Sequence, residues 1–262
     1  AESERHAFQQ IETERTGRQG NMGLGQMVSV LSYRFCLSGL FRFGVLKKQK
    51  ITQHNMKGIF PIEGFKAMET PFYYYNTELL RQTLSTINIE AGKHEQFRVH
   101  YAIKANANPK LLNIISHAGL GADCVSGGEI KAAIDAGFSR DKIVYAGVGK
   151  SDWEINIGID NEIQCFNVES VPELEVINEI ASARGKVANV AFRINPNVGA
   201  HTHANITTGL AENKFGIAMR DMENVIVLSL KMKNINFHGL HFHIGSQILD
   251  MGDFEALCNR IN

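Results

Sequence analysis

The stretch that decides the fold is His100-Tyr101-Ala102-Ile103-Lys104-Ala105-Asn106. It predicts a short apolar strand that ends at Lys104, and Asn108-Pro109 then opens an amphipathic helix. A lysine at the end of a buried strand is costly unless its ammonium reaches water or its amine is used. A nucleophilic amine needs a pKa below the usual value of about 10.4. From this stretch alone, Lys104 is either a solvated lysine with a packed stem or a reactive amine.

Beyond Phe97 the chain alternates predicted strands and helices with regular spacing. We predict that the strands end at Lys104, Asp123, Tyr145, Phe166, Arg193 and His243. Most of these ends are separated by about twenty residues, the length of one βα unit. The helix starts are marked by Asn108-Pro109, Ser126 with Glu129, Ser151 with Glu154, and Ser170 with Glu173. This pattern predicts parallel strands, in a (βα) barrel or a doubly wound sheet.

The barrel is favoured because polar residues gather at successive strand ends, which form the reaction face of a (βα)₈ barrel. Asp123 ends the second strand as a buried carboxylate, which needs a partner such as Lys104, Arg193 or His243. A closed barrel has eight strands, whereas we count six before the last residue. We therefore expect an incomplete barrel.

The last predicted strand belongs to Gly239–Gln247 and carries two histidines. His241 and His243 are two residues apart, so they point to the same face of the strand. An H-x-H at a strand end is also a metal-binding pattern in some hydrolases, with Asp123 as a further ligand, and that alternative stays open. Ser246 follows Gly245, where a hydroxyl and nearby backbone N–H groups suit a phosphate or begin the next helix.

Composition excludes some classes of function. The 262 residues are 44% hydrophobic and 21% charged, which is typical of a globular protein. The 27 basic and 27 acidic residues cancel, so bulk charge predicts no nucleic-acid binding. The 4 cysteines show no C-x-x-C spacing, and this favours reduced, packed thiols in a cytoplasmic protein.

The first 84 residues differ from the regular part. Residues 1–55 form an extension whose apolar stretch 27–46 contains Arg34 and Arg42, which is poor for a membrane span or a signal peptide. A basic amphipathic segment, a targeting remnant and sequence outside the natural reading frame all stay open, because Met56 suits a start. For 56–84, the N-terminal strand and helix segment, we predict two short β-prone runs between Gly58 and Asn76, the clearer one at Phe72–Tyr75. A helix with Thr77 as N-cap then runs to Asn88.

Five motifs, in order along the chain, resemble the pyridoxal-phosphate-dependent decarboxylases with an alanine-racemase-like barrel. They are Tyr101–Asn106, Asp123–Glu129, Phe192–Pro196, Thr208–Ile217 and Gly239–Gln247. The resemblance covers about 56–262 and is closest to the branch that acts on diaminopimelate. It implies an α/β fold, with 85–262 as part of a pyridoxal-phosphate-binding (β/α)₈ TIM barrel. It also implies that 56–84 pairs with a second, mostly β domain that the sequence does not contain.

The resemblance assigns roles to individual residues. Lys104 would be the catalytic lysine that holds pyridoxal 5′-phosphate as a Schiff base, and His243 the ring stacked on the pyridine. Ser246 would bind the phosphate, and Asp123 and Arg193 would lie at the base of the pocket. We expect Glu129 to act mainly as a helix cap. His241 is expected to be a hydrogen-bonded core histidine, and His201 and His203 to be solvated loop residues.

The implied activity is decarboxylation of meso-2,6-diaminopimelate to L-lysine and carbon dioxide by a cytoplasmic homodimer, with no resident metal and no nucleic-acid or membrane partner. Carboxynorspermidine, ornithine and arginine decarboxylases are the nearest alternatives. A non-catalytic pyridoxal-phosphate-binding barrel is another, although the Thr208–Ile217 stretch has no evident use in a carrier. The resemblance also places a glycine-rich phosphate loop and the glutamate for the pyridine nitrogen after residue 262.

Overall fold

The computed structural model describes residues 60–197, 215–246, 248 and 250–261. The expectations for residues 1–55, His201, His203 and most of Thr208–Ile217 lie outside this range. The chain divides into two units, which contribute residues 60–80 and 81–261 to the described part. Each unit is described by itself.

The first unit is built from aromatic contacts. Helix α1 (Ile62–Lys66) places Phe65 with ring centroids 5.3 Å from Phe72 and 5.0 Å from Tyr74. The predicted strand at Phe72–Tyr75 is wrong in extent, because only Tyr73 forms a β bridge. In a strand, successive side chains would point to opposite faces. Here the rings pack against one short helix instead.

Helix α2 (Thr77–Ala91) begins at Thr77, the residue predicted to cap it, and its cap therefore lies one residue earlier than predicted. The Asn76 side-chain oxygen accepts a hydrogen bond from the Leu79 backbone N–H at 2.9 Å, so Asn76 caps the helix and Thr77 is its first residue. Both residue types cap helices well, and the sequence alone did not separate them.

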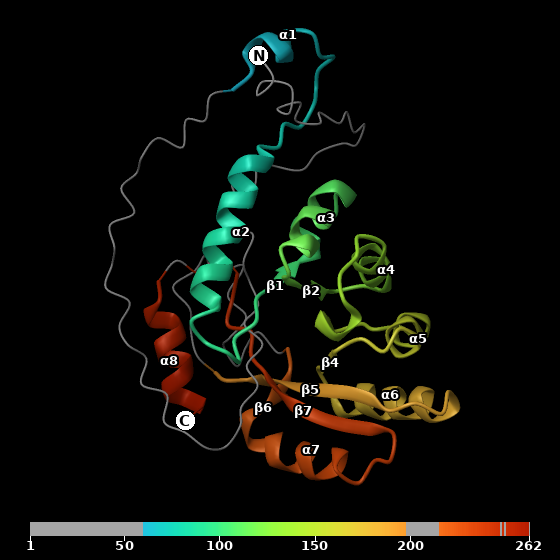
Figure 1. The fold of residues 1–262 in the computed structure, drawn as a ribbon. Helices are drawn as coiled ribbons and strands as arrows, with labels where there is room; N and C mark the ends of the chain where they lie inside the picture. Colours follow the sequence, from blue (N-terminus) through green and yellow to red (C-terminus); the bar gives the residue numbers. More distant parts are fainter. Residues whose placement is uncertain (1–59, 198–214, 247, 249, 262) are drawn as a thin grey trace. The chain divides into compact units, whose positions relative to one another are not determined.

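The second unit contains a parallel sheet in the order β1-β2-β3-β4-β5, and β6 and β7 both pair with β5 (Figure 1). The strands are β1 (His100–Ala102), β2 (Gly121–Cys124), β3 (Ile143–Tyr145), β4 (Cys165–Val168), β5 (Ala188–Asn195), β6 (Ile217–Ala218) and β7 (Ile235–His241). The helices between them are α3 (Pro109–His117), α4 (Gly127–Asp135), α5 (Asp152–Asp160), α6 (Val171–Ala183) and α7 (Met222–Ser229), and α8 (Gly252–Ile261) follows β7. Strand–helix alternation with parallel pairing confirms the predicted α/β class.

The two faces of the sheet differ in side-chain size. Ala102, Asp123 and Val144 are paired in register and therefore share one face. The other face carries Tyr145 and Phe166, which are also register partners and are almost fully buried. The helices cover this bulky face. Gly158 of α5 approaches so closely that a Cβ there would lie 2.5 Å from the Phe166 ring.

The predicted helix starts are confirmed, with one difference in how the glutamates are used. Asn108 accepts from the Lys110 N–H at 3.0 Å, and the Ser126 and Ser170 hydroxyls accept from Glu129 and Glu173 N–H at 3.2 and 3.4 Å. The two carboxylates do not reach back to the cap residue itself. They accept from the residue before it, at 2.7 Å for Val125 N–H and 3.0 Å for Glu169 N–H.

Some predicted strand ends are shifted. Lys104 lies in a 3₁₀ turn (Ile103–Ala105) just after β1, β5 continues two residues past Arg193, and β7 ends two residues before His243. The two-residue strand β6 and helix α7 were not predicted. A strand of two residues has no readable alternation, so its pairing with β5 could not come from pattern alone.

Two of the predicted packed thiols lie in the sheet, where Cys124 and Cys165 are buried and free. Burial raises the pKa of Cys165 to about 12, so it is an inert thiol. No helix in the described part of the chain is long and apolar enough to cross a membrane.

Candidate active site

Lys104 lies at the C-terminal end of β1 with its side chain exposed. The chain leaves the strand there through a 3₁₀ turn, which directs the lysine away from the core that Ile103 enters. The positive charge of Lys104 lowers the pKa of Asp123, Glu129 and His243. The lysine is therefore close to groups that lie on or after two other strands, β2 and β7, and is still accessible.

Asp123 is the buried carboxyl beside it. It pairs in register with Ala102 and is only 4% exposed. Burial raises the pKa of Asp123 to about 7, although the Lys104 charge acts in the opposite direction. Its Oδ1 atom is buried and has no hydrogen-bond partner among the described residues. Near neutral pH this carboxyl can therefore hold a proton or accept one hydrogen bond.

Glu129 combines capping with proximity to the lysine. Its Oε2 atom accepts from the Val125 N–H, and its own N–H donates to Ser126, which agrees with the predicted capping role. Burial raises the pKa of Glu129, and the Val125 hydrogen bond and the Lys104 charge lower it. The cap thus also brings a second carboxylate to Lys104.

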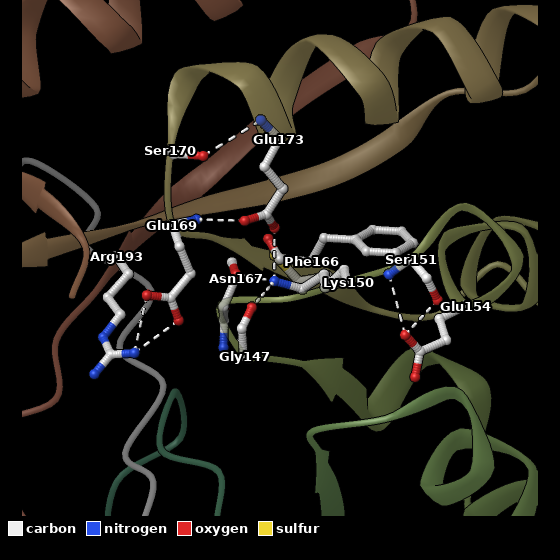
Figure 2. Close-up of polar contacts among 11 residues, drawn as sticks. Gly147, Lys150, Ser151, Glu154, Phe166, Asn167, Glu169, Ser170, Glu173 and Arg193 are labelled. Carbon is white, nitrogen blue, oxygen red and sulfur yellow. Dashed lines mark hydrogen bonds and ion pairs between the residues drawn. The ribbon is translucent and has the colours of Figure 1, made fainter.

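Arg193 is held in a buried ion pair (Figure 2). Its Nη1 atom donates to both oxygens of Glu169 at 2.7 and 2.9 Å, and its guanidinium lies 5.6 Å from the Phe215 ring centroid. Arg193 and Glu169 are 8% and 7% exposed. A buried charge of this kind persists only when it is paired and hydrogen-bonded. Glu169 was not predicted as a site residue. The sequence signal that could have indicated it is a charged residue placed directly after a strand and before a helix cap.

The two histidines are neutral at physiological pH. Burial first, and then the Arg193 charge, lower the pKa of His241 to about 3 and that of His243 to about 4. His241 pairs in register with Arg193 and is buried, and His243 is half-buried beyond the end of β7. The predicted core position of His241 is confirmed, whereas its predicted hydrogen bonding stays a prediction. Its Nδ1 atom is buried without a partner among the described residues.

A second lysine, Lys150, lies past the end of β3 and was not predicted (Figure 2). Its Nζ atom donates to the Gly147 and Asn167 carbonyls at 2.8 Å each, and to Glu173 Oε1 at 2.6 Å. Its side chain is 0% exposed. The other lysine ion pairs in the described part of the chain are at least partly exposed, so Lys150 is the lysine whose amine is fully enclosed.

The strand ends thus bring together Lys104, Asp123, Glu129, Arg193 and the two histidines through hydrogen bonds, register or mutual charge effects. Ser246 lies three residues past His243 and is half-buried. In the described ranges, no three or more histidine, cysteine, aspartate or glutamate side chains gather as a metal site.

Parallel strands with polar groups at their C-terminal ends define the reaction face of a (βα)-barrel. The family model for the pyridoxal-binding domain of pyridoxal-dependent decarboxylases matches residues 80–262. The chain therefore belongs to this family, and its parallel sheet is of the pyridoxal-binding barrel type.

The chain is 71% identical over 207 residues to diaminopimelate decarboxylase from Bacteroides thetaiotaomicron, which is 79% of this chain and 54% of that protein. It is 40% identical over 192 residues to the enzyme of that name from Aquifex aeolicus, or 73% of this chain and 45% of that one. A crystal structure of diaminopimelate decarboxylase from Helicobacter pylori with L-lysine matches with a TM-score of 0.71 at 38% identity, covering 76% of this chain and 50% of that one. The chain spans about half the length of the relatives it matches.

Proposed function

We propose that this chain binds pyridoxal 5′-phosphate through Lys104, and that the complete protein decarboxylates meso-diaminopimelate to L-lysine. The observation that carries the proposal is the accessible Lys104 amine beside Asp123, a buried carboxyl with an unpaired oxygen. Lys150, the competing amine after β3, has all three N–H donors occupied.

The residues present fit a bound pyridoxal phosphate. Asp123 Oδ1 and His241 Nδ1 are buried polar atoms without partners in the described structure, as expected where a polar ligand completes the site. Lys104 would hold the cofactor aldehyde, and Ser246 would contact its phosphate. When bound, pyridoxal phosphate supplies an electron sink for the bond that releases carbon dioxide.

The remaining site residues would control charge and orientation around the cofactor. His243 is neutral, so its ring can stack on an aromatic face without adding a positive charge to the pocket. Arg193 contributes a guanidinium whose charge is already balanced by Glu169. Asp123 has a pKa of about 7 and can therefore hold a proton on its carboxyl at the pH of the reaction.

The substrate assignment rests on the relatives. Those reported above are diaminopimelate decarboxylases, and one was solved with L-lysine, the product expected from meso-diaminopimelate. We propose in addition that the complete protein is a cytoplasmic homodimer. We also propose that 56–84 pairs with a β domain, and that 85–262 belongs to the barrel.

The proposal has two separable tests. Borohydride reduction of the cofactor-loaded protein, followed by peptide mapping, should place the modified lysine at Lys104, and modification of another lysine would contradict the site. The complete gene product should release carbon dioxide from meso-diaminopimelate in preference to ornithine, arginine and carboxynorspermidine. If it released none from meso-diaminopimelate, the substrate assignment would be wrong.

A further inference from the structure

Lys150 has a hydrogen-bond acceptor for each of its N–H donors, yet the proposed chemistry does not use it. Its ammonium donates to two backbone carbonyls and one carboxylate, and it lies 5.2 Å from the Tyr145 ring centroid. An ammonium has three N–H donors, so this set leaves none for a ligand. A locked, charged amine cannot act as a nucleophile, but it can fix the groups around it.

The contacts continue from Lys150 to the arginine of the site (Figure 2). One oxygen of Glu173 accepts from Lys150 Nζ at 2.6 Å, and the other accepts from the Glu169 backbone N–H at 3.0 Å. The Glu169 carboxylate in turn binds Arg193. The chain of contacts thus joins the loop after β3, the end of β4, the first turn of α6, and β5.

Helix capping alone does not explain Glu173. The N–H of Glu173 is already bonded to the Ser170 hydroxyl, so the helix start is satisfied without the carboxylate. The carboxylate is therefore available to bridge Lys150 and the Glu169 backbone. Removing Lys150 would leave this buried carboxylate without its cation, and a buried unpaired charge reorganises its surroundings.

We propose that Lys150 is a positioning residue. Through Glu173 it fixes the backbone of Glu169, and through the Glu169 carboxylate it fixes the guanidinium of Arg193 at the cofactor-binding face. The geometric part rests only on the observed contacts, whereas its consequence for the cofactor rests on the proposed function. Lys150 itself contacts neither cofactor nor substrate.

The test follows the Arg193 side chain directly in cofactor-free protein. With ¹⁵N-labelled arginine, the buried Arg193 guanidinium should give a signal protected from solvent exchange, assigned by its loss in Arg193→Lys. Lys150→Met should raise its exchange rate roughly tenfold or more, because Glu173, which accepts from the Glu169 backbone N–H, loses the cation that holds it. Backbone amides of β5 should stay protected, which separates loss of positioning from unfolding.

Lys142→Met is the matched control, because Lys142 precedes β3 and its Nζ atom also bonds a backbone carbonyl, that of Gly119, at 3.0 Å. It should leave the Arg193 signal unchanged. If Lys150→Met does not fold, Glu173→Gln replaces it, since an amide can satisfy only one of the two contacts of the carboxylate. An Arg193 signal that stays protected in the folded variant overturns the proposal.

A double-mutant cycle then tests the link to the cofactor. Lys150→Met should weaken pyridoxal phosphate binding several-fold in the parent protein, but only slightly in an Arg193→Met background, because both substitutions remove the same contact. Equal losses in both backgrounds would overturn the link. Failure of the parent protein to bind the cofactor would instead contradict the proposed function, with the guanidinium result still decisive for the geometry.

Discussion

The ends of β1 and β3 carry the same residue type in opposite states. Lys104 is exposed, and its positive charge lowers the pKa of two carboxyl groups and one histidine. Lys150 is completely buried and bonded to three acceptors. The two lysines of this sheet therefore differ in how many acceptors surround the amine, and this difference supports the proposed assignment of the cofactor to Lys104.

The histidines on and after β7 extend this comparison. The charge of Lys150 contributes to the lowered pKa of His241, and the charge of Lys104 contributes to that of His243. The pKa of each histidine is thus lowered by a different one of the two lysines, although burial and the Arg193 charge lower both pKa values more. The first two predictions compare Lys104 with Lys150, and the others compare the two histidines.

The largest expected effect is complete loss of covalently held cofactor in Lys104→Ala. No other described strand-end lysine has a free amine, so borohydride should fix no pyridoxal phosphate to this variant. Its free energy of unfolding should change by only about 0.5 kcal/mol, because the side chain is exposed. Near-ultraviolet absorbance of the reduced pyridoxyl adduct measures the covalently held cofactor, and thermal unfolding measures the stability. Retained reducible cofactor would show that another lysine carries it.

Lys150→Met should instead have its main effect on stability. It leaves the buried Glu173 carboxylate without its cation, which lowers the free energy of unfolding by about 3–5 kcal/mol. Denaturant unfolding of Lys150→Met and Lys104→Met, side by side, measures the difference. Replacing Glu173 by Met as well should recover part of the loss, because the unpaired charge is then gone. Equal stability of the two single variants would mean that the buried contacts contribute nothing net.

Acid sensitivity should depend on the histidines. In the folded state His241 and His243 have pKa values of about 3 and about 4, below the ordinary histidine value of 6.5, so between pH 6.5 and 4 the unfolded chain binds protons that the folded protein does not. Stability therefore falls as the pH falls through this window, by about 1.4 kcal/mol per pH unit for each histidine.

Asp123 acts in the opposite direction, because its raised pKa of about 7 makes the folded state bind a proton in the same window. The difference between variants is therefore more informative than the absolute slope. His241→Phe should reduce the acid slope of the cofactor-free protein by about 1.4 kcal/mol per pH unit, measured by denaturant unfolding at several pH values. An unchanged slope would mean that His241 is protonated in the folded state.

The smallest expected effect distinguishes the two histidines in cofactor retention. His243 is half-buried on the Lys104 side, so His243→Ala should remove a ring contact worth about 0.5–1.5 kcal/mol, a several-fold loss of affinity. His241→Ala, which alters a buried position, should affect retention less. Dialysis followed by measurement of the bound pyridoxal phosphate compares them. Equal losses would point to a shared role, either in the core or at a metal.

Sequence by itself determined the alternation of strands and helices, the caps at Asn108, Ser126 and Ser170, and the gathering of Lys104, Asp123, Arg193 and His243 at one end of a parallel sheet. These features follow from short-range patterns, because caps act over three residues and strand spacing over one βα unit. The shifted strand ends, and the aromatic segment at Phe72–Tyr75 that is not a strand, show where local preference was outweighed by packing.

Only the tertiary structure decided which lysine is locked and what holds Arg193. The acceptors of Lys150 include Asn167 and Glu173, which lie 17 and 23 residues away, and Glu169 lies 24 residues from Arg193. No periodic pattern encodes such pairs, since they depend on adjacent strand ends meeting after the sheet has formed. The pKa of a buried group is decided in the same way, because removal of water, rather than residue type, sets the cost of its charge.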